Sequence, residues 1–216
     1  MLRGIYVAAA GMDVQQARTQ VLANNIANLT TPGYRRDTVT FATFLSHALS
    51  RDEEGWPAPV GRHHLGAAVD QVVTDYAPGP LVNTGNAHHV AIAGEGFFTV
   101  ETAAGEAYTR DGTFSVDAEG YLVTAAGSRV LGEGGPIQVN GPFTIGPHGE
   151  VSAGGQVIDT LRITAFDNPA ALTKNEGNTF TDPGGAGARP AAGYRVMQGW
   201  LEQANVDLAQ EMTDLI

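Results

Sequence analysis

The stretch VLANNIANLTTPGYRRDTVTF, residues 21–41, decides how this chain is organised, because it joins the end of an amphipathic helix to an extended segment. Leu22, Ile26 and Leu29 recur at helical spacing and predict an apolar stripe. Amide side chains follow one another at a spacing of four beside that stripe: Gln20, Asn24 and Asn28. The stretch holds no chemically reactive group, so the pattern indicates a segment that packs against other helices.

A stop follows directly after the helix. Thr31 precedes a proline, which disfavours the α region for it, so the helix must end before this residue. Pro32 and Gly33 suit the two central positions of a type II turn, because proline presets φ and glycine accepts a positive φ. The sequence therefore predicts a helix, a tight turn and a short extended exit.

Upstream of the stop, residues 3 to about 28 predict one helix roughly 39 Å long. Small residues at 8–11 and several amides interrupt its apolar seam. Most helix stability in proteins comes from packing the apolar face, so such a helix needs a partner. The seam follows a repeat of about seven residues: Ile5, Ala8, Ala9, Met12, Thr19, Leu22 and Ile26.

The far end of the chain offers that partner. Asn205 is predicted to cap a helix over residues 206–216, and Leu201 lies just before the cap. The apolar stripe of this helix would consist of Leu208, Met212 and Leu215. Opposite charges favour pairing of the two ends, since residues 1–36 carry Arg3, Arg18, Arg35 and Arg36, whereas residues 196–216 carry Glu202, Asp207, Glu211 and Asp214. The alternative is that the acidic residues only favour a helix start.

The middle of the chain changes character. Residues 41–49 carry a brief helical pattern, and residues 51–66 lack periodicity and predict a loop or linker. From about 67 to 190 the apolar period becomes two, with glycine-containing turn signals at close spacing, which predicts antiparallel strands. The aromatic residues of this part are expected to form its core: Phe97, Phe98, Tyr108, Phe114 and Tyr121.

The expected fold class is therefore α+β, mainly β, with an antiparallel β-rich domain inserted between N- and C-terminal helical segments that pair as a coiled coil. The expected domains are a discontinuous terminal helical domain (1–50 plus 196–216), a loop or linker (51–66) and a β-rich outer domain (67–195).

Composition narrows the function classes. A net charge of −11 argues against a nucleic-acid partner, because phosphates need neutralising side chains. The absence of cysteine excludes disulfides and thiol chemistry. The N-terminal apolar run is too short for a signal peptide and is soon interrupted by Asp13, so we expect no cleaved signal. No run approaches the roughly 18–20 apolar residues of a membrane span, so we expect no membrane insertion.

Candidate catalytic motifs are weak. The GEG of residues 94–96 lacks the rest of a dinucleotide fingerprint. Adjacent histidines at 63–64 and 88–89 would point to opposite faces of a strand, which does not suit a metal site. Acidic residues in or beside turns could imitate a glycosidase pair but commonly serve the backbone: Asp111, Asp117 and Glu119. We expect no catalytic, cofactor or metal site. The alternative is a secreted β-domain enzyme or carbohydrate-binding module.

Three ordered blocks carry a resemblance to a known family: LANNIANLTTPGYRR (22–36), GEGFFTVETAAGEAYTRDGTFSVDAEGYLVTAAGSRVLG (94–132) and QGWLEQANVDLAQEMTDLI (198–216). They resemble the N-terminal, central and C-terminal signatures of the bacterial flagellar basal-body rod proteins of the FlgF/FlgG type. With residues 143–180 the resemblance covers nearly the whole chain. The length is nearer to the FlgF-like proximal-rod members, with a FlgG-like distal-rod or hook-type subunit as the alternative. The sequence Ala87-His88-His89 departs from the family pattern at a local turn.

The resemblance implies a structural subunit that assembles with itself and other rod subunits into a helical tube in the cell envelope, or periplasm, and transmits torque from motor to hook. Implied partners are the hook and ring proteins of the basal body and the flagellar type III export apparatus. The terminal helices would form an inner layer and the β-rich domain an outer layer. The family's C-terminal helices continue beyond Ile216, so we expect a truncated sequence or an incomplete helical layer.

Carried onto this sequence, the resemblance places subunit contacts on the terminal segments and a hinge between the layers. The assembly contacts would be Ile5, Met12, Leu22, Asn24, Asn25, Ile26, Asn28, Leu201, Leu208, Met212 and Leu215. The hinge would be Thr31, Pro32, Gly33 and Tyr34.

Overall fold

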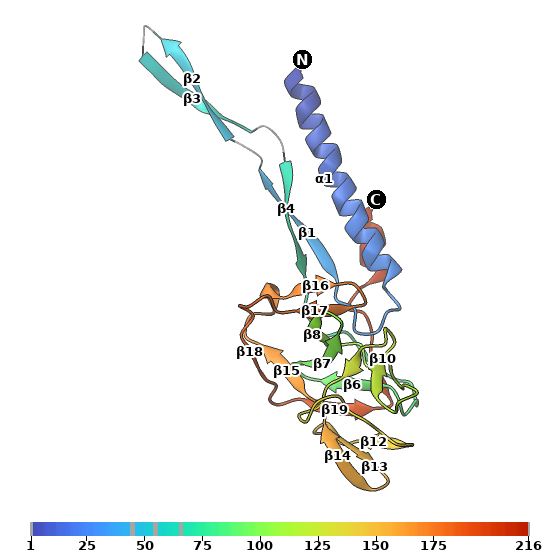
Figure 1. The fold of residues 1–216 in the computed structure, drawn as a ribbon. Coiled ribbons are helices and arrows are strands. Elements are labelled where there is room, and N and C mark those ends of the chain that lie inside the picture. Colours follow the sequence, from blue (N-terminus) through green and yellow to red (C-terminus); the bar gives the residue numbers. More distant parts are fainter. Residues whose placement is uncertain (1, 44–45, 54–55, 65–66, 216) are drawn as a thin grey trace. The chain divides into compact units, whose positions relative to one another are not determined.

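The computed structural model describes residues 2–43, 46–53, 56–64 and 67–215, and it divides into two compact units (Figure 1). The first unit comprises Met1–Ala27, Asp37–Asp75 and Leu208–Ile216, and the second comprises Asn28–Arg36 and Tyr76–Asp207. Each unit therefore joins segments that are distant in the sequence.

The first unit is built on the long N-terminal helix α1 (Leu2–Ala27), which confirms the helix predicted from residue 3 to about 28. Strands β1 (Asp37–Thr43) and β4 (Ala67–Thr74) form an antiparallel ribbon that packs against α1. The short C-terminal helix α2 (Leu208–Leu215) also contacts α1. Strands β2 (Ser46–Glu53) and β3 (Trp56–His64) pair as a second antiparallel ribbon.

Two predictions for the segment after the first turn are wrong. The helical pattern at 41–49 falls on β1 and β2, with residues 44 and 45 outside the described part. The predicted loop at 51–66 holds the end of β2 and all of β3, with residues 54, 55, 65 and 66 outside the described part. The cause is that cross-strand pairing supplies the stabilising contacts, and strand propensity depends strongly on that context. Pro57 and Pro59 lie within β3, which a two-stranded ribbon tolerates because each strand keeps one unpaired edge.

An antiparallel sheet of nine strands forms the centre of the second unit in the described part of the chain. Its main path is β16 (Thr173–Asn175), β17 (Thr179–Thr181), β8 (Gly105–Thr109), β7 (Phe97–Thr102), β11 (Arg129–Val130), β10 (Leu122–Thr124) and β9 (Phe114–Val116). Strand β15 (Ile163–Phe166) pairs with β7 and with β18 (Ala188–Pro190).

Smaller antiparallel sheets complete the second unit. They are β12 (Phe143–Ile145) with β13 (Glu150–Ala153) and β14 (Gln156–Thr160), β6 (Val90–Ala93) with β19 (Arg195–Gln198), and β5 (Leu81–Asn83) with β20 (Trp200–Glu202). A 3-10 turn, η1, spans Pro169–Ala171.

Because β19 and β20 pair with β6 and β5, the residues before α2 belong to the β-rich unit. Because β1 and β4 pair with each other and pack against α1, residues 37–75 belong to the unit that contains the helices. The unit boundaries therefore differ from the predicted domains at 1–50 plus 196–216, 51–66 and 67–195.

The core of the second unit contains most of the aromatic residues predicted for it. Phe98 and Phe114 meet edge to face, with ring centroids 5.0 Å apart, in the larger apolar cluster. Phe97 and Tyr108 belong to a second cluster around Phe180. Ile137 and Val139 are buried on either side of Gln138, which forms an isolated bridge with Tyr121. The fold is thus mainly β with antiparallel sheets and a helix toward each end, as predicted.

Candidate functional site

The predicted turn after the first helix is present in the second unit. The Tyr34 amide donates to the Thr31 carbonyl at 3.3 Å, and Gly33 has a φ of +67°. A Cβ at Gly33 would also lie 2.6 Å from the Arg110 oxygen and the Asp111 nitrogen. Glycine is therefore needed twice, for its positive φ and for the close approach of another backbone segment.

Hydrogen bonds hold this turn against the β-rich unit. The Gly33 amide donates to the Glu202 carbonyl at 2.7 Å, and the Asn178 side-chain amide donates to the Pro32 carbonyl at 2.9 Å. The ammonium group of Lys174 lies 3.9 Å from the centroid of the Tyr34 ring. The four residues predicted to form a hinge are thus fixed parts of the second unit.

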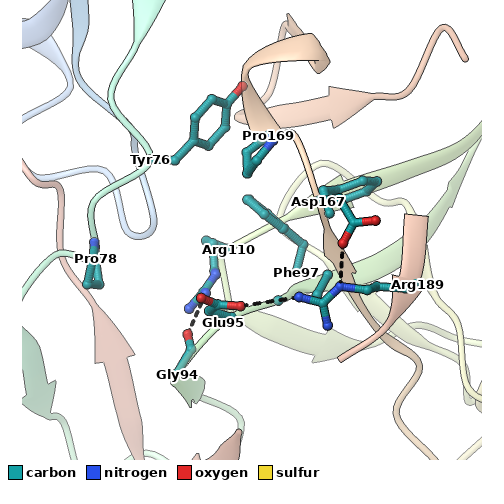
Figure 2. Close-up of a pocket in the computed structure, with 12 residues that line it drawn as sticks. Tyr76, Pro78, Gly94, Glu95, Phe97, Arg110, Asp167, Pro169 and Arg189 are labelled. Carbon is teal, nitrogen blue, oxygen red and sulfur yellow. Dashed lines mark hydrogen bonds and ion pairs between the residues drawn. The ribbon is translucent and has the colours of Figure 1, made fainter. Parts of the chain in front are cut away.

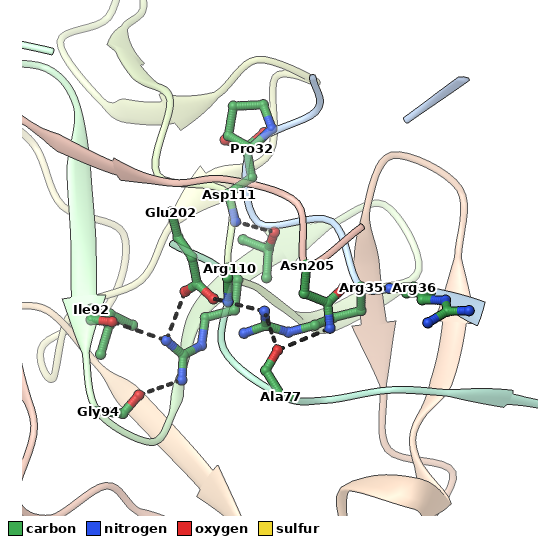
Figure 3. A network of polar contacts seen from close by, with 12 residues as sticks. Pro32, Arg35, Arg36, Ala77, Ile92, Gly94, Arg110, Asp111, Glu202 and Asn205 are labelled. Atoms are coloured by element: carbon green, nitrogen blue, oxygen red, sulfur yellow. Dashed lines mark hydrogen bonds and ion pairs between the residues drawn. The ribbon is translucent and has the colours of Figure 1, made fainter. Parts of the chain in front are cut away.

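A buried ionic network lies next to the turn, centred on Glu202 of β20 (Figure 3). Arg35 donates to one carboxylate oxygen at 2.7 Å and Arg110 donates to the other at 3.0 Å. Their side chains are 1% and 5% exposed. The Gly79 amide also donates to the carboxylate, at 2.9 Å. One carboxylate therefore joins three distant parts of the chain.

Backbone carbonyls accept further hydrogen bonds from the two guanidinium groups. Arg110 donates to the carbonyls of Ile92 at 3.1 Å and Gly94 at 2.6 Å, and Arg35 donates to that of Ala77 at 3.0 Å. Burial lowers the pKa of the Arg110 guanidinium from its ordinary value, while the charge of Glu202 raises it and that of Arg35 lowers it. An arginine stays protonated at neutral pH, so Arg110 keeps its positive charge in this network.

Asn205 does not cap the C-terminal helix, which corrects the prediction for this residue. Helix α2 begins at Leu208, directly after Asp207. The Asn205 side chain accepts from the Arg36 amide at 2.7 Å and donates to the Ala77 carbonyl at 3.0 Å. A residue that forms good caps also forms good bridges between backbone segments, and only the tertiary structure distinguishes the two uses.

The predicted assembly residues fall into three groups. Leu22 and Asn25 are buried in the first unit, while Leu201 is buried in the second. Asn24 is exposed, and Ile26 and Asn28 are half-buried. The remaining residues are apolar side chains that are strongly exposed on α1 and α2: Ile5, Met12, Leu208, Met212 and Leu215. The last group forms the exposed apolar stripes of the two helices.

Direct contacts join α1 and α2 within the first unit. Arg18 lies 3.5 Å from Asp214, and the Asn25 side-chain amide donates to the Glu211 carboxylate at 3.1 Å. The later residue on α1 meets the earlier residue on α2, so the helices run antiparallel. Arg18–Asp214 and Arg35–Glu202 each join a basic residue of segment 1–36 to an acidic residue of segment 196–216, the two segments whose opposite charges favour pairing.

A pocket of about 600 Å³ lies in the second unit, with Tyr76, Pro78, Phe97 and Phe166 in its walls (Figure 2). Arg189 at its edge lies 2.8 Å from Asp167 and 3.6 Å from Glu95. Arg189 is thus engaged with the two carboxylates that line this pocket. The described residues contain no group of three side chains suited to holding a metal ion.

Two of the three acidic residues considered for catalysis serve turns. Asp111 accepts from the Thr113 amide at 2.9 Å, and Asp117 accepts from the Tyr121 amide at 2.6 Å. His88 packs edge-on against Phe143, with ring centroids 5.2 Å apart. The side chains of the pair at 63–64 lie outside the described ones. In the part of the chain that the structure covers, no helix is long and apolar enough to cross a membrane.

The described residues thus combine a β-rich unit with terminal helices that expose apolar side chains. Two family models match the chain: the D1 domain of the flagellar hook proteins FlgE/F/G over residues 91–153, and the flagella basal body rod protein over residues 5–35.

Whole-chain relatives agree with these matches. The flagellar basal-body rod protein FlgF of Caulobacter vibrioides is 32% identical over all of this chain and 87% of its own length. The corresponding figures are 36% and 89% for FlgG of Agrobacterium fabrum, and 33% and 89% for FlgG of Bacillus subtilis. The chain therefore belongs to the family of flagellar basal-body rod proteins, which are structural proteins and not enzymes. The predicted resemblance is confirmed, while FlgF and FlgG relatives match to a similar degree.

Proposed function

We propose that this chain is a subunit of the flagellar basal-body rod that assembles with copies of itself and with other rod subunits through its terminal helices. The helices form the inner layer of a helical tube as a coiled coil, and the β-rich unit forms the outer layer. The tube transmits torque from motor to hook and meets the hook and ring proteins. The type III apparatus exports the subunit without a cleaved signal peptide.

The observation that carries this proposal is the exposure of apolar side chains on both terminal helices. Met12 is 66% exposed and Met212 is 53% exposed, with Ile5, Leu208 and Leu215 exposed on the same two helices. Full burial of a fully exposed side chain of this kind is worth about 1.5–3 kcal/mol, so covering these residues, which are about half exposed, favours a partner by roughly half of that each. Exposed apolar patches of this kind mark interaction surfaces.

The hinge role of residues 31–34 is part of the proposal. The chain leaves the first unit after Ala27 and returns to it at Asp37. Between these points the turn is fastened to the second unit at Gly33 and Pro32. A segment held in this way sets where the inner layer ends and the outer layer begins.

The experiment is complementation of swimming in a strain that lacks the gene. Met212→Glu places a charge in the exposed apolar stripe and should abolish swimming and rod formation while the purified variant stays folded. Thr213→Glu is the matched control, because it adds the same charge at the neighbouring exposed position. Normal swimming of the Met212→Glu strain, with intact basal bodies, would reject the proposed assembly surface.

We further propose that this subunit occupies a FlgF-like position in the proximal rod. The chain aligns over 223 residues with FlgF of Caulobacter vibrioides and over 242 with FlgG of Agrobacterium fabrum, so matching FlgG requires more gaps. Expression in separate FlgF and FlgG deletion strains tests this position. Rescue of the FlgF deletion alone is expected, and rescue of the FlgG deletion alone would reverse the assignment.

A further inference from the structure

We propose that Asn25 and Glu211 fix the register and rotation with which α2 docks on α1, so that the apolar stripe of α2 faces outward for neighbouring subunits. This inference rests on the proposed function, because the outward stripe has a use only in assembly.

The first observation is that α2 is buried on its polar side. Glu211 is 0% exposed and is the buried residue of the described part of this helix. Leu208, Met212 and Leu215 are 42%, 53% and 49% exposed. An amphipathic helix that docks by hydrophobic burial alone would turn these residues inward. A polar contact therefore determines which face of α2 meets the rest of the first unit.

The second observation is the way in which Asn25 is used. Its side-chain nitrogen donates to the Asp37 carbonyl at 2.9 Å and to a Glu211 oxygen at 3.1 Å. Its side-chain oxygen accepts from the Asp37 amide at 3.0 Å. Both N–H groups are thus engaged, and this buried amide connects α1, the start of β1 and α2.

A shift of α2 by one turn would move Glu211 by about 5.4 Å along the axis and break its contact with Asn25. Both groups would lose a partner in a buried place, which is costly for an amide and more so for a carboxylate. The exposed pair of Arg18 and Asp214 is too weak to set the register by itself. Buried polar residues are known to fix the register of paired helices.

Cross-linking measures the register directly, because the chain has no natural cysteine. Arg18→Cys with Asp214→Cys reports the register seen here, and Arg18→Cys with Gln210→Cys reports a shift by one turn. The full chain is treated at high dilution with a short bifunctional maleimide, and the linked peptides within one chain are quantified by mass spectrometry. The native pair should exceed the shifted pair roughly tenfold or more.

Glu211→Leu is the decisive variant, since leucine fills the buried position but cannot accept from Asn25. It should stay folded by circular dichroism and reduce the preference for the native pair to about twofold or less. Glu211→Gln keeps an acceptor oxygen and should restore the native preference. An unchanged preference in Glu211→Leu would overturn the inference, as would equal loss in both variants.

Complementation separates this inference from the proposed function. Glu211→Leu is expected to impair swimming, and Glu211→Gln to rescue it. If Glu211→Leu loses the register yet swims normally, register has no role in presenting the stripe and the inference fails, while the proposed function stands. If instead the Met212→Glu strain swims normally, the proposed function fails. In that case, cross-linking in which only Glu211→Leu loses the preference for the native pair still supports the assigned register.

Discussion

The guanidinium of Arg35 lies 2.7 Å from the carboxylate of Glu202, and both side chains are 1% exposed. Arg35 lies in the segment between α1 and β1, and Glu202 ends the last strand before α2. This ion pair therefore fastens the two connections to the terminal helices to one place in the β-rich unit.

Glu202→Gln should strongly destabilise the second unit, because it leaves Arg35 and Arg110 buried without their counter-charge. Removing one partner of a buried ion pair costs about 3–5 kcal/mol of unfolding free energy. Urea unfolding followed by the fluorescence of Trp200, two residues away in β20, measures the loss. Asp167→Asn is the control, because its exposed pair with Arg189 contributes about 0–1 kcal/mol. Equal losses in the two variants would contradict the network's role.

Gly33→Ala should destabilise the protein more than Gly85→Ala. Both glycines have similar φ angles, +67° and +69°, so both variants carry a left-handed strain of about 1–2 kcal/mol. Only the Cβ at position 33 would press on the backbone of Arg110 and Asp111, since nothing lies within 4 Å at position 85. Parallel urea titrations compare the two variants. A loss at position 33 no greater than at position 85 would refute the close approach.

Pro32→Ala should leave the β-rich unit folded but impair rod assembly. The Pro32 carbonyl that accepts from Asn178 is retained in alanine, and the added freedom of the unfolded chain costs only about 0.4–1 kcal/mol. The turn would then direct the exit from the helical layer less strictly. Swimming and counts of intact basal bodies check the effect. Normal assembly in this variant would remove the hinge role from residues 31–34.

Tyr108→Phe should reduce the loss of stability at alkaline pH. Burial, followed by the nearby charge of Glu106, raises the pKa of Tyr108 above its ordinary 10.0. The folded state therefore keeps the phenol proton at pH values where the unfolded chain has lost it. The contribution of this pKa difference to the free energy of unfolding is fully present below pH 10. It is lost as pH rises through the folded-state pKa, by at most about 1.4 kcal/mol per pH unit. Urea titrations above pH 10 should show that the free energy of unfolding falls less steeply with pH in the variant than in the unsubstituted protein. Equal slopes would contradict this prediction.

The sequence was most informative where local chemistry decides the structure. Proline followed by glycine predicts the turn at Pro32 and Gly33, and helical spacing predicts α1. Alternating apolar residues and turn signals predict an antiparallel β-rich unit. Charge asymmetry between the ends of the chain points to pairs such as Arg18–Asp214, although it does not say which residues meet.

Long-range pairing explains the failures. Strands β2 and β3 are stabilised by each other, so the irregular sequence at 51–66 gave no signal. Asn205 bridges backbone segments that meet only after folding. Arg110 lies beside an Asp-Gly turn signal, and nothing local marks it as a partner of Glu202. The burial of Glu211 runs against the amphipathic pattern of its own helix, so only the structure identifies it.

The most direct test of the assembly surface is thiol accessibility in purified basal bodies. Met12→Cys and Met212→Cys place single thiols in the exposed apolar stripes of the otherwise cysteine-free chain, and Val157→Cys on β14 is the control. All three thiols should react with a membrane-impermeant maleimide in the isolated subunit. In basal bodies, protection of positions 12 and 212 by tenfold or more is expected. Labelling of both positions at the monomer rate in intact basal bodies would contradict assembly through the terminal helices.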